Sequence, residues 1–285
     1  MNIGVIGYGV VGRATAEVLG RLGHTVSVGD TDGDRVEAAG DDGFGCLRRS
    51  ARVDVLFVCV PEDNLHGALV AAPESRSTVI RSTVRPGTTD ALCAELGRSL
   101  AYMPETLREA TSLWDELNPP FLVIGCHDPR QGEVLTQLFA PLLAPAVIVP
   151  PATAEMVKLV LNAYLHTLIS FWNEIHLICE RTGVQSHVVG KLCSQDPRVS
   201  AYGASLHGKG VGGRCLPKDL VQIIAFAEGI GQHPELLLAV QRVNEKLTEH
   251  RNGASVNHRD PLKWPTVPVI PSSCLETVDL VEEVQ

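Results

Sequence analysis

A glycine-rich turn between a short apolar strand and a helical segment constrains the fold of this chain most strongly. The chain opens with MNIGVIGYGVVG, in which residues 7–12 have the pattern GxGxxG directly after the strand-like residues 2–6. In such a turn the first glycine allows the tight bend, the second lets the backbone approach a pyrophosphate, and the third lets the helix pack closely on the strand. The following helix N-terminus offers N–H groups to phosphates. The sequence therefore predicts a dinucleotide site at Gly7, Gly9, Val10, Val11 and Gly12.

A carboxylate closes the next predicted strand. Residues 24–30 have the sequence HTVSVGD, and Asp30 follows the turn at about the separation of 20 residues that is typical of dinucleotide-binding folds. A carboxylate here accepts hydrogen bonds from the hydroxyls of an adenosine ribose and repels a 2′-phosphate. We therefore expect NAD, rather than NADP, as the cofactor.

Strand-like and helix-like segments alternate through the first half of the chain. Further apolar and β-branched strands are predicted at residues 54–60, 77–83, 121–126 and 145–150. A helix is predicted over 129–143, between the last two strands. This alternation is typical of a parallel sheet covered by helices on both faces. We therefore expect an α/β fold, a doubly wound parallel sheet that forms an NAD-binding domain over residues 1–150.

The pattern changes after Pro150. Residues 152–183 have no strand signature and predict one long helix that begins at a Thr153 cap and ends at Gly183. Its apolar residues lie on more than one side, so we expect it to be buried between layers or subunits and to form a homodimer interface.

More helices are expected beyond this long helix. They are predicted at residues 185–194, 217–231 and 234–250. A helical dimerisation and catalytic domain is therefore expected over 151–251. Residues 252–273 are rich in Pro, Ser and Asn, and an irregular tail is expected over 252–285.

Composition limits the partners of the protein. Its formal net charge is -9 and aromatic residues make up only 5% of it, without the basic stripe that is typical of nucleic-acid binding. The histidines and cysteines show no metal-ligand spacing, and no apolar run is long enough to span a bilayer. The N-terminus lacks the basic region of a signal peptide. We therefore expect a cytoplasmic protein that binds a small molecule, with no metal, nucleic acid or membrane partner.

Four further stretches follow the glycine-rich turn. They are RSTVRPGTTD at 81–90, MPETLREA at 103–110, AEMVKLVLNAYL at 154–165 and GVGGRCLPKDL at 210–220. In this order the five stretches resemble the UDP-glucose/GDP-mannose dehydrogenase family over about residues 1–250, and the last stretch is the most specific. The resemblance implies a biosynthetic oxidoreductase that oxidises the primary alcohol of a nucleotide sugar to a carboxylate with two NAD, removing four electrons.

Such a reaction explains the cysteine of the last stretch, Cys215. Removal of hydride from a primary alcohol gives an aldehyde, which has no second hydride to give until a nucleophile adds to it. A thiolate at Cys215 would form a thiohemiacetal, whose carbon can lose hydride to a second NAD. The product is a thioester, which water must hydrolyse.

The resemblance implies roles for other residues at matching positions. Lys158 and Asn162, spaced i, i+4 on one helix face, would hold the reacting oxygen and stabilise the oxyanion. Asp219 and Thr83 would hold or activate water near the thiol, and Thr83 also belongs to the expected cofactor site. Glu105 would take part in thioester hydrolysis.

Substrate contacts are implied for a second set of residues. Arg198 matches an arginine that can reach across a dimer to the bound nucleotide, for which its guanidinium is suited. The expected substrate-binding residues are Glu105, Leu107, Arg108, Glu109, Lys158, Asn162, Arg198 and Gly212.

The family also has a third domain that grips the nucleotide, and the resemblance fades near Arg251. We therefore expect a shortened member that lacks this domain and acts on a nucleotide sugar, a nucleoside or a sugar phosphate. Two alternatives stay open. One is a two-electron dehydrogenase of the β-hydroxyacid type, which has a similar Lys-x-x-x-Asn but lacks the cysteine motif. The other is a non-catalytic NAD-binding partner protein.

Overall fold

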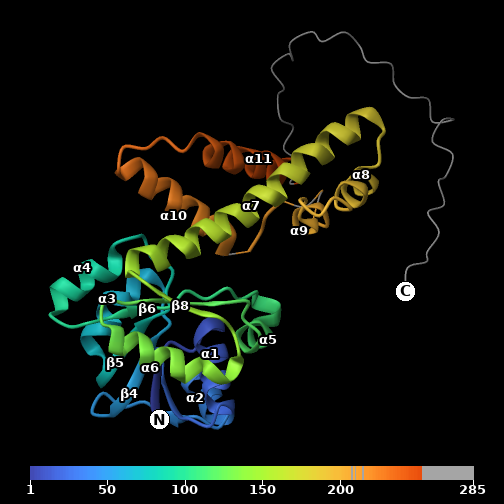
Figure 1. The fold of residues 1–285 in the computed structure, drawn as a ribbon. Helices are drawn as coiled ribbons and strands as arrows, with labels where there is room; N and C mark the ends of the chain where they lie inside the picture. Colours follow the sequence, from blue (N-terminus) through green and yellow to red (C-terminus); the bar gives the residue numbers. More distant parts are fainter. Residues whose placement is uncertain (207, 209, 214, 252–285) are drawn as a thin grey trace. The chain divides into compact units, whose positions relative to one another are not determined.

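The computed structural model describes residues 1–206, 208, 210–213 and 215–251. The chain divides into two compact units, Met1–Leu161 and Asn162–Gln285. One continuous helix, α7 (Pro151–Thr182), runs through the division (Figure 1). The tail predicted at 252–285 lies outside the described residues, and the domain limits expected at residues 150 and 251 stay predictions.

The first unit is built on an eight-stranded sheet in the order β3-β2-β1-β4-β5-β6-β7-β8. The strands are β1 (Asn2–Ile6), β2 (Thr25–Gly29), β3 (Gly45–Cys46), β4 (Arg52–Val58), β5 (Glu74–Ile80), β6 (Ala101–Tyr102), β7 (Leu122–Gly125) and β8 (Ala146–Val149). Neighbouring strands pair in parallel, except that β6 and β7 are antiparallel. The first six strands have the order of a doubly wound dinucleotide-binding fold, which confirms the predicted fold class.

Helices cover this sheet on both faces, and β4 shows why. Val55 and Phe57 belong to one apolar cluster with residues of α1 (Val10–Arg21) and α6 (Pro129–Phe139). Leu56 and Val58 belong to a second cluster with residues of α3 (Glu62–Ala71) and α4 (Thr88–Leu96). Because both faces are buried, the strand is a continuous apolar run instead of an alternating one. The other helices of this unit are α2 (Gly33–Asp41) and α5 (Ser112–Leu117), with 3-10 turns at Glu109–Thr111 and Ala140–Leu142.

The strand predicted at 77–83 lies three residues earlier, at Glu74–Ile80. Its neighbour β6 is only two residues long and pairs with Val79 and Ile80, so no partner extends the ladder further on that side. Beyond Ile80 the Ser82 hydroxyl donates to the carbonyl of Val60 at 2.6 Å. Residues 81–83 therefore form a loop at the carboxyl edge of the sheet.

The second unit is helical. It contains the part of α7 from Asn162, then α8 (Ser186–Cys193), α9 (Ala201–Ala204), α10 (Cys215–Gly229) and α11 (Glu235–Arg251). Ala163 of α7, Leu220 and Ile224 of α10 and Val240 of α11 form its buried apolar cluster.

The ends of α7 follow from its sequence. The helix begins at Pro151, two residues before the predicted Thr153 cap, because proline is favoured in the first turn, where its missing N–H has no helical partner. It ends before Gly183, whose φ of 72° is the left-handed conformation that commonly terminates a helix. Among the helices that the structure describes, none has the length and apolar character needed to cross a membrane.

A buried carboxylate anchors the start of α7 within the first unit. Glu155 is fully buried and accepts the N–H groups of Gly87 and Thr89 at 2.6 and 2.7 Å, at the N-terminus of α4. These two N–H groups have no helical carbonyl of their own, so the side chain acts as a cap from another helix.

We expect Glu155→Ala to lower the free energy of unfolding by about 1–3 kcal/mol, because it leaves buried donors unpaired. Urea unfolding would measure the change. Glu133→Ala, at an exposed position of α6, is the control and should change stability by no more than about 0.5 kcal/mol. Equal urea midpoints for Glu155→Ala and the wild type would contradict the capping role.

Candidate active site

The glycine-rich turn leaves room for a ligand where the sequence predicts one. Gly7 has a φ of +92°, and a Cβ on it would lie 2.6 Å from the carbonyl oxygen of Cys59. A Cβ on Gly12 would lie 1.7 Å from the carbonyl oxygen of Gly7, so neither position accepts a side chain. In contrast, a Cβ on Gly9 would meet no protein atom within 4 Å. The turn is thus closely packed on the protein side and open at Gly9.

The open side of the turn lies at a helix N-terminus. Gly9 is the N-cap of α1, and Val10 and Val11 are its first two residues. The N–H groups of a first helical turn have no carbonyl partner within the helix and attract anions. This arrangement fits the pyrophosphate of a dinucleotide.

Asp30 lies directly beside the turn. Its carboxylate accepts the N–H groups of Tyr8 at 2.6 Å and Asp32 at 3.0 Å, and the guanidinium of Arg35 is 3.6 Å away. Burial alone would raise the pKa of Asp30, but these N–H groups and the Arg35 charge together lower it. The carboxylate is therefore charged at neutral pH. Its remaining lone pairs suit ribose hydroxyls, and its charge disfavours a 2′-phosphate.

Two more predicted residues follow neighbouring strands of the sheet. Thr83 comes after β5 and is half-buried, and Glu105 comes after β6 and is buried. Because β5 and β6 are parallel, their carboxyl ends lie at the same edge of the sheet. Ligands of doubly wound folds bind outside this edge.

Lys158 and Glu105 form a buried ion pair. The Lys158 ammonium lies 2.7 Å from Oε1 of Glu105 and donates to the main-chain carbonyl of the same residue at 2.9 Å. The second carboxylate oxygen accepts the N–H of Leu107 at 2.9 Å. Both side chains are less than a tenth exposed, so each charge is compensated mainly by the other. The structure thus joins a predicted oxyanion-stabilising residue to a predicted hydrolytic residue.

The segment after Glu105 is more exposed. Arg108 forms an ion pair with Asp115 at 2.6 Å, and hydrogen bonds from Arg108 are the main reason why the pKa of Asp115 falls to about 2. Glu109 is exposed at the start of a 3-10 turn. Of these expected substrate residues, Arg108 is oriented by a contact within the protein.

A second buried ion pair was not predicted from the sequence. Arg81 donates to Glu116 Oε2 at 3.1 Å and to the Thr15 hydroxyl of α1 at 3.1 Å. Both charged side chains are less than a tenth exposed. Burial lowers the pKa of Arg81, but Glu116 more than offsets this and raises it. The pair fixes Arg81, two residues before Thr83, against α1 and α5. The sequence signals this pair only by an arginine at the end of an apolar strand.

In the second unit, Asn162 and Asp219 are bonded to each other. The Asn162 amide donates to Oδ2 of Asp219 at 2.5 Å, and Asp219 is almost fully buried. The Lys218 ammonium lies 2.8 Å from Oδ1 as an ion pair, without the geometry of a hydrogen bond. This pairing fixes one carboxylate oxygen of Asp219 toward α7.

Cys215 is the exposed first residue of α10. Cys215 and Asp219 are four residues apart in this helix and therefore share a face. A helix N-terminus favours an anionic group such as a thiolate. Gly212, three residues earlier, is exposed and has no protein atom within 4 Å of where a Cβ would be.

Arg198 is exposed and held by a near neighbour. Its guanidinium donates to both carboxylate oxygens of Asp196, at 2.9 and 2.6 Å. The role expected for Arg198 across a dimer stays a prediction.

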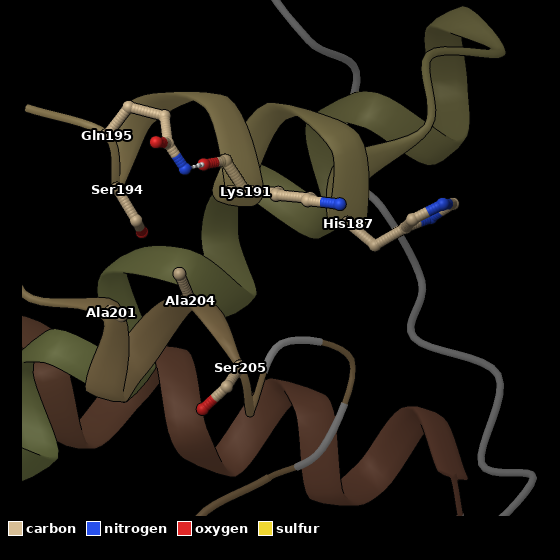
Figure 2. Close-up of a pocket in the computed structure, with 8 residues that line it drawn as sticks. His187, Lys191, Ser194, Gln195, Ala201, Ala204 and Ser205 are labelled. Atoms are coloured by element: carbon tan, nitrogen blue, oxygen red, sulfur yellow. Dashed lines mark hydrogen bonds between the residues drawn. The ribbon is translucent and has the colours of Figure 1, made fainter. Parts of the chain in front are cut away.

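A separate shallow pocket of about 400 Å³ lies between α8 and α9 (Figure 2). Its lining residues are His187, Gly190, Lys191, Ser194, Gln195, Ala201, Ala204 and Ser205. None of the predicted site residues lines it. Within the described part of the chain, no three His, Cys, Asp or Glu side chains are placed to hold a metal ion.

Comparisons with protein families match most of the chain. The NAD-binding domain of the UDP-glucose/GDP-mannose dehydrogenase family matches residues 47–143, and the central domain of the same family matches residues 152–246. A further match, to the family described as NADP oxidoreductase, coenzyme F420-dependent, covers residues 2–86.

Individual proteins show the same relationship. The chain is 31% identical to the UDP-glucose 6-dehydrogenase YwqF of Bacillus subtilis, over 86% of this chain and 66% of that protein. It is 32% identical to the UDP-glucose 6-dehydrogenase AglM of Haloferax volcanii, over 86% and 70%. A solved UDP-glucose dehydrogenase from Pyrobaculum islandicum matches with a TM-score of 0.75 and 29% identity, over 88% of this chain and 71% of that one. The chain thus spans about two thirds of the length of these relatives.

The Lys158–Glu105 pair can be tested through stability. We expect Lys158→Met and Glu105→Leu each to lower the free energy of unfolding by about 3–5 kcal/mol, because each leaves one buried charge without its partner. The double variant should lose clearly less than the sum, since it buries no charge. A urea-unfolding double-mutant cycle measures this coupling. Strictly additive losses would show that the two charges do not depend on each other.

Proposed function

Because the chain belongs to the UDP-glucose/GDP-mannose dehydrogenase family, we propose that it catalyses the NAD-dependent, four-electron oxidation of a primary alcohol to a carboxylate. The proposed substrate is a nucleotide sugar, or a related nucleoside or sugar phosphate. One alcohol, two NAD⁺ and one water would give one carboxylate, two NADH and three protons.

The observation that carries this proposal is the pairing of four predicted catalytic residues. Lys158 is bonded to Glu105, and Asn162 is bonded to Asp219. Buried polar groups are costly unless they are paired, and these are paired with one another. Each pair, within its own unit, supports a preorganised polar contact better than it supports an ordinary apolar core.

Cofactor binding is assigned to the first unit. The N–H groups of Gly9, Val10 and Val11 would bind the pyrophosphate, and Asp30 would accept hydrogen bonds from the adenosine ribose. Thr83, in the loop at the carboxyl edge of the sheet, would complete this site. The bound NAD would supply the hydride acceptor.

Lys158 and Asn162 are assigned to the oxygen that reacts. In the first oxidation this oxygen becomes a carbonyl, and in the later steps it carries negative charge. An ammonium and an amide four residues apart on one helix would donate hydrogen bonds to it.

Cys215 is assigned as the nucleophile. Its thiolate would add to the aldehyde carbon to form a thiohemiacetal, from which the second hydride leaves with its electron pair. The resulting thioester has a C–S bond that water must break, releasing the carboxylate and the thiol. Asp219, with Thr83 and Glu105, would hold the water and accept its proton.

Substrate binding is assigned to a further set of residues: Leu107, Arg108, Glu109, Arg198 and Gly212. Among them, Gly212 offers exposed backbone, while Arg108 and Arg198 offer guanidinium groups suited to phosphate. We place the protein in the cytoplasm, where reducing conditions keep a catalytic thiol reduced.

Two other functions are separated from this one by their products. A two-electron dehydrogenase of the β-hydroxyacid type would form one NADH per substrate. A non-catalytic NAD-binding partner would form none. The buried Asn162–Asp219 pair and the cysteine motif favour the four-electron reaction.

We also propose a homodimer. Tyr164, Phe171 and Ile178 of α7 are each more than half exposed. They are seven residues apart and therefore form one apolar stripe along the helix, the spacing typical of a helix–helix seam. A second copy of α7 would cover this stripe in a two-fold dimer.

Counting NADH tests the reaction. With limiting UDP-glucose and excess NAD, we expect two NADH per sugar from the wild type, measured by absorbance. Cys215→Ala should lose this yield, because no thiohemiacetal can form. Cys193→Ala removes an exposed thiol of α8 and should keep two. One NADH per sugar from the wild type would instead favour the two-electron alternative, and no NADH would move the search to nucleosides and sugar phosphates.

The cofactor assignment is tested at Asp30. We expect Asp30→Ala to weaken NAD binding by roughly tenfold, the effect of losing a hydrogen bond to a charged group, and to reduce the preference for NAD over NADP. Calorimetric titration measures both affinities. Asp34→Ala, at an exposed position of α2, is the control. An unchanged NAD affinity in Asp30→Ala would remove the residue from the site.

Sedimentation velocity tests the dimer. The wild type should sediment as a dimer at micromolar concentration, and Phe171→Asp should sediment as a monomer because it places a charge in the apolar seam. Leu236→Asp, at an exposed position of α11, should leave the dimer intact. A monomeric wild type would contradict the proposed interface.

A further inference from the structure

We infer that His166 is a positioning residue for the nucleophile: its imidazole holds the first turn of α10, and thereby orients Cys215. This inference rests on the proposed function only for the chemical role of Cys215. The contact itself lies entirely within the second unit.

His166 occupies the face of α7 that meets α10. It follows Asn162 by four residues, so the two side chains share this face. Nδ1 of His166 lies 3.4 Å from the carbonyl oxygen of Leu216, the residue next to Cys215, and only 1% of His166 is exposed. The helix face that binds Asp219 thus also contacts the turn that bears the thiol.

The direction of this hydrogen bond follows from its acceptor. A carbonyl oxygen can only accept, so the proton lies on Nδ1 of His166. Burial lowers the pKa of His166, which keeps the ring neutral at neutral pH. The ring therefore donates one hydrogen bond to Leu216 and has Nε2 as an acceptor.

The first turn of α10 needs such a contact. The apolar residues that anchor this helix, Leu220 and Ile224, lie one turn or more further along. Helix ends open more readily than helix centres, because they have fewer contacts. Polar side chains of α7 contact this end at the carbonyl of Leu216 and at the carboxylate of Asp219.

A histidine is a costly choice for a purely structural position. Its Nε2 is buried and has no hydrogen-bond partner among the described residues. An apolar side chain of similar volume would avoid this desolvation penalty and would fill the same space. The cost is explained if the Nδ1 hydrogen bond is needed to orient the neighbouring cysteine.

Three substitutions separate the hydrogen bond from packing. His166→Asn places an amide donor near the position of Nδ1 and should preserve the bond. His166→Gln places its amide nearer Nε2, and His166→Leu removes the donor altogether. Thr167→Val is the control on the same helix, since its hydroxyl donates to the carbonyl of Ala163 within α7. Should His166→Leu fail to fold, the Asn and Gln variants still decide the question.

The first readout is the rate at which iodoacetamide alkylates Cys215, followed by peptide mass spectrometry. We expect His166→Gln and His166→Leu to slow alkylation about fivefold, the factor that corresponds to a hydrogen bond of about 1 kcal/mol. In a loosened first turn, the N–H groups of the helix N-terminus no longer stabilise the thiolate, so alkylation is slower. His166→Asn and Thr167→Val should match the wild type, and the exposed Cys46 and Cys193 should react equally in all variants.

The second readout is activity with excess NAD. We expect kcat to fall roughly tenfold or more in His166→Gln, with an unchanged KM for NAD, because misplacing a reacting group slows chemistry without altering cofactor binding. Equal alkylation of Cys215 in all variants, or equal slowing in the Asn and Gln variants, would overturn the inference. Altered alkylation in a protein that forms no NADH from UDP-glucose, from nucleosides or from sugar phosphates would reject the proposed function and retain the positioning role.

Discussion

The buried ion pair between Lys158 and Glu105 is the contact on which the candidate site depends. Two charges withdrawn from water are tolerated only because each neutralises the other and because Glu105 also accepts a backbone N–H. The pair binds α7 to the loop that follows β6. One turn earlier, Glu155 binds the same helix to the N-terminus of α4. The start of α7 is therefore fixed at the carboxyl edge of the sheet by two buried carboxylates.

This anchoring gives one helix face an unusual composition. Lys158, Asn162 and His166 follow one another at intervals of four residues, and all three are buried. Each is bonded to a residue from another segment, respectively Glu105, Asp219 and Leu216. A stripe of this kind would be destabilising if its members lacked partners, because water cannot replace lost hydrogen bonds in the interior. Lys158 is thus held by the loop after β6 within the first unit, and Asn162 and His166 are held by the first turns of α10 within the second.

The local sequence is sufficient to predict those parts of the structure that local steric constraints determine. Gly7 and Gly12 are required because a Cβ at either would collide with backbone, and this requirement is visible as GxGxxG. The long helix was equally visible, since residues 152–183 contain no strand pattern. The strand expected at 77–83 was misplaced because β-branched residues favour a strand, whereas the short β6 ends its ladder at Ile80. The Arg81–Glu116 pair joins residues 35 apart in the sequence, and no local pattern encodes such a partnership.

The same reasoning explains why the polar residues are informative about function. Hydrophobic side chains at positions 105, 158, 166 and 219 would pack without a desolvation penalty, and replacing buried ion pairs by apolar groups is often stabilising. Burying two carboxylates, an ammonium and an imidazole instead lowers the stability of the fold at each of these four positions. That cost is understandable if the charges and dipoles must already be oriented when negative charge develops on a substrate oxygen, since a preorganised site need not reorganise during the reaction. The Lys158 ammonium and the Asn162 amide share one face of α7 only while the helix between them is regular. The regularity of α7 is therefore itself a requirement of the proposed chemistry.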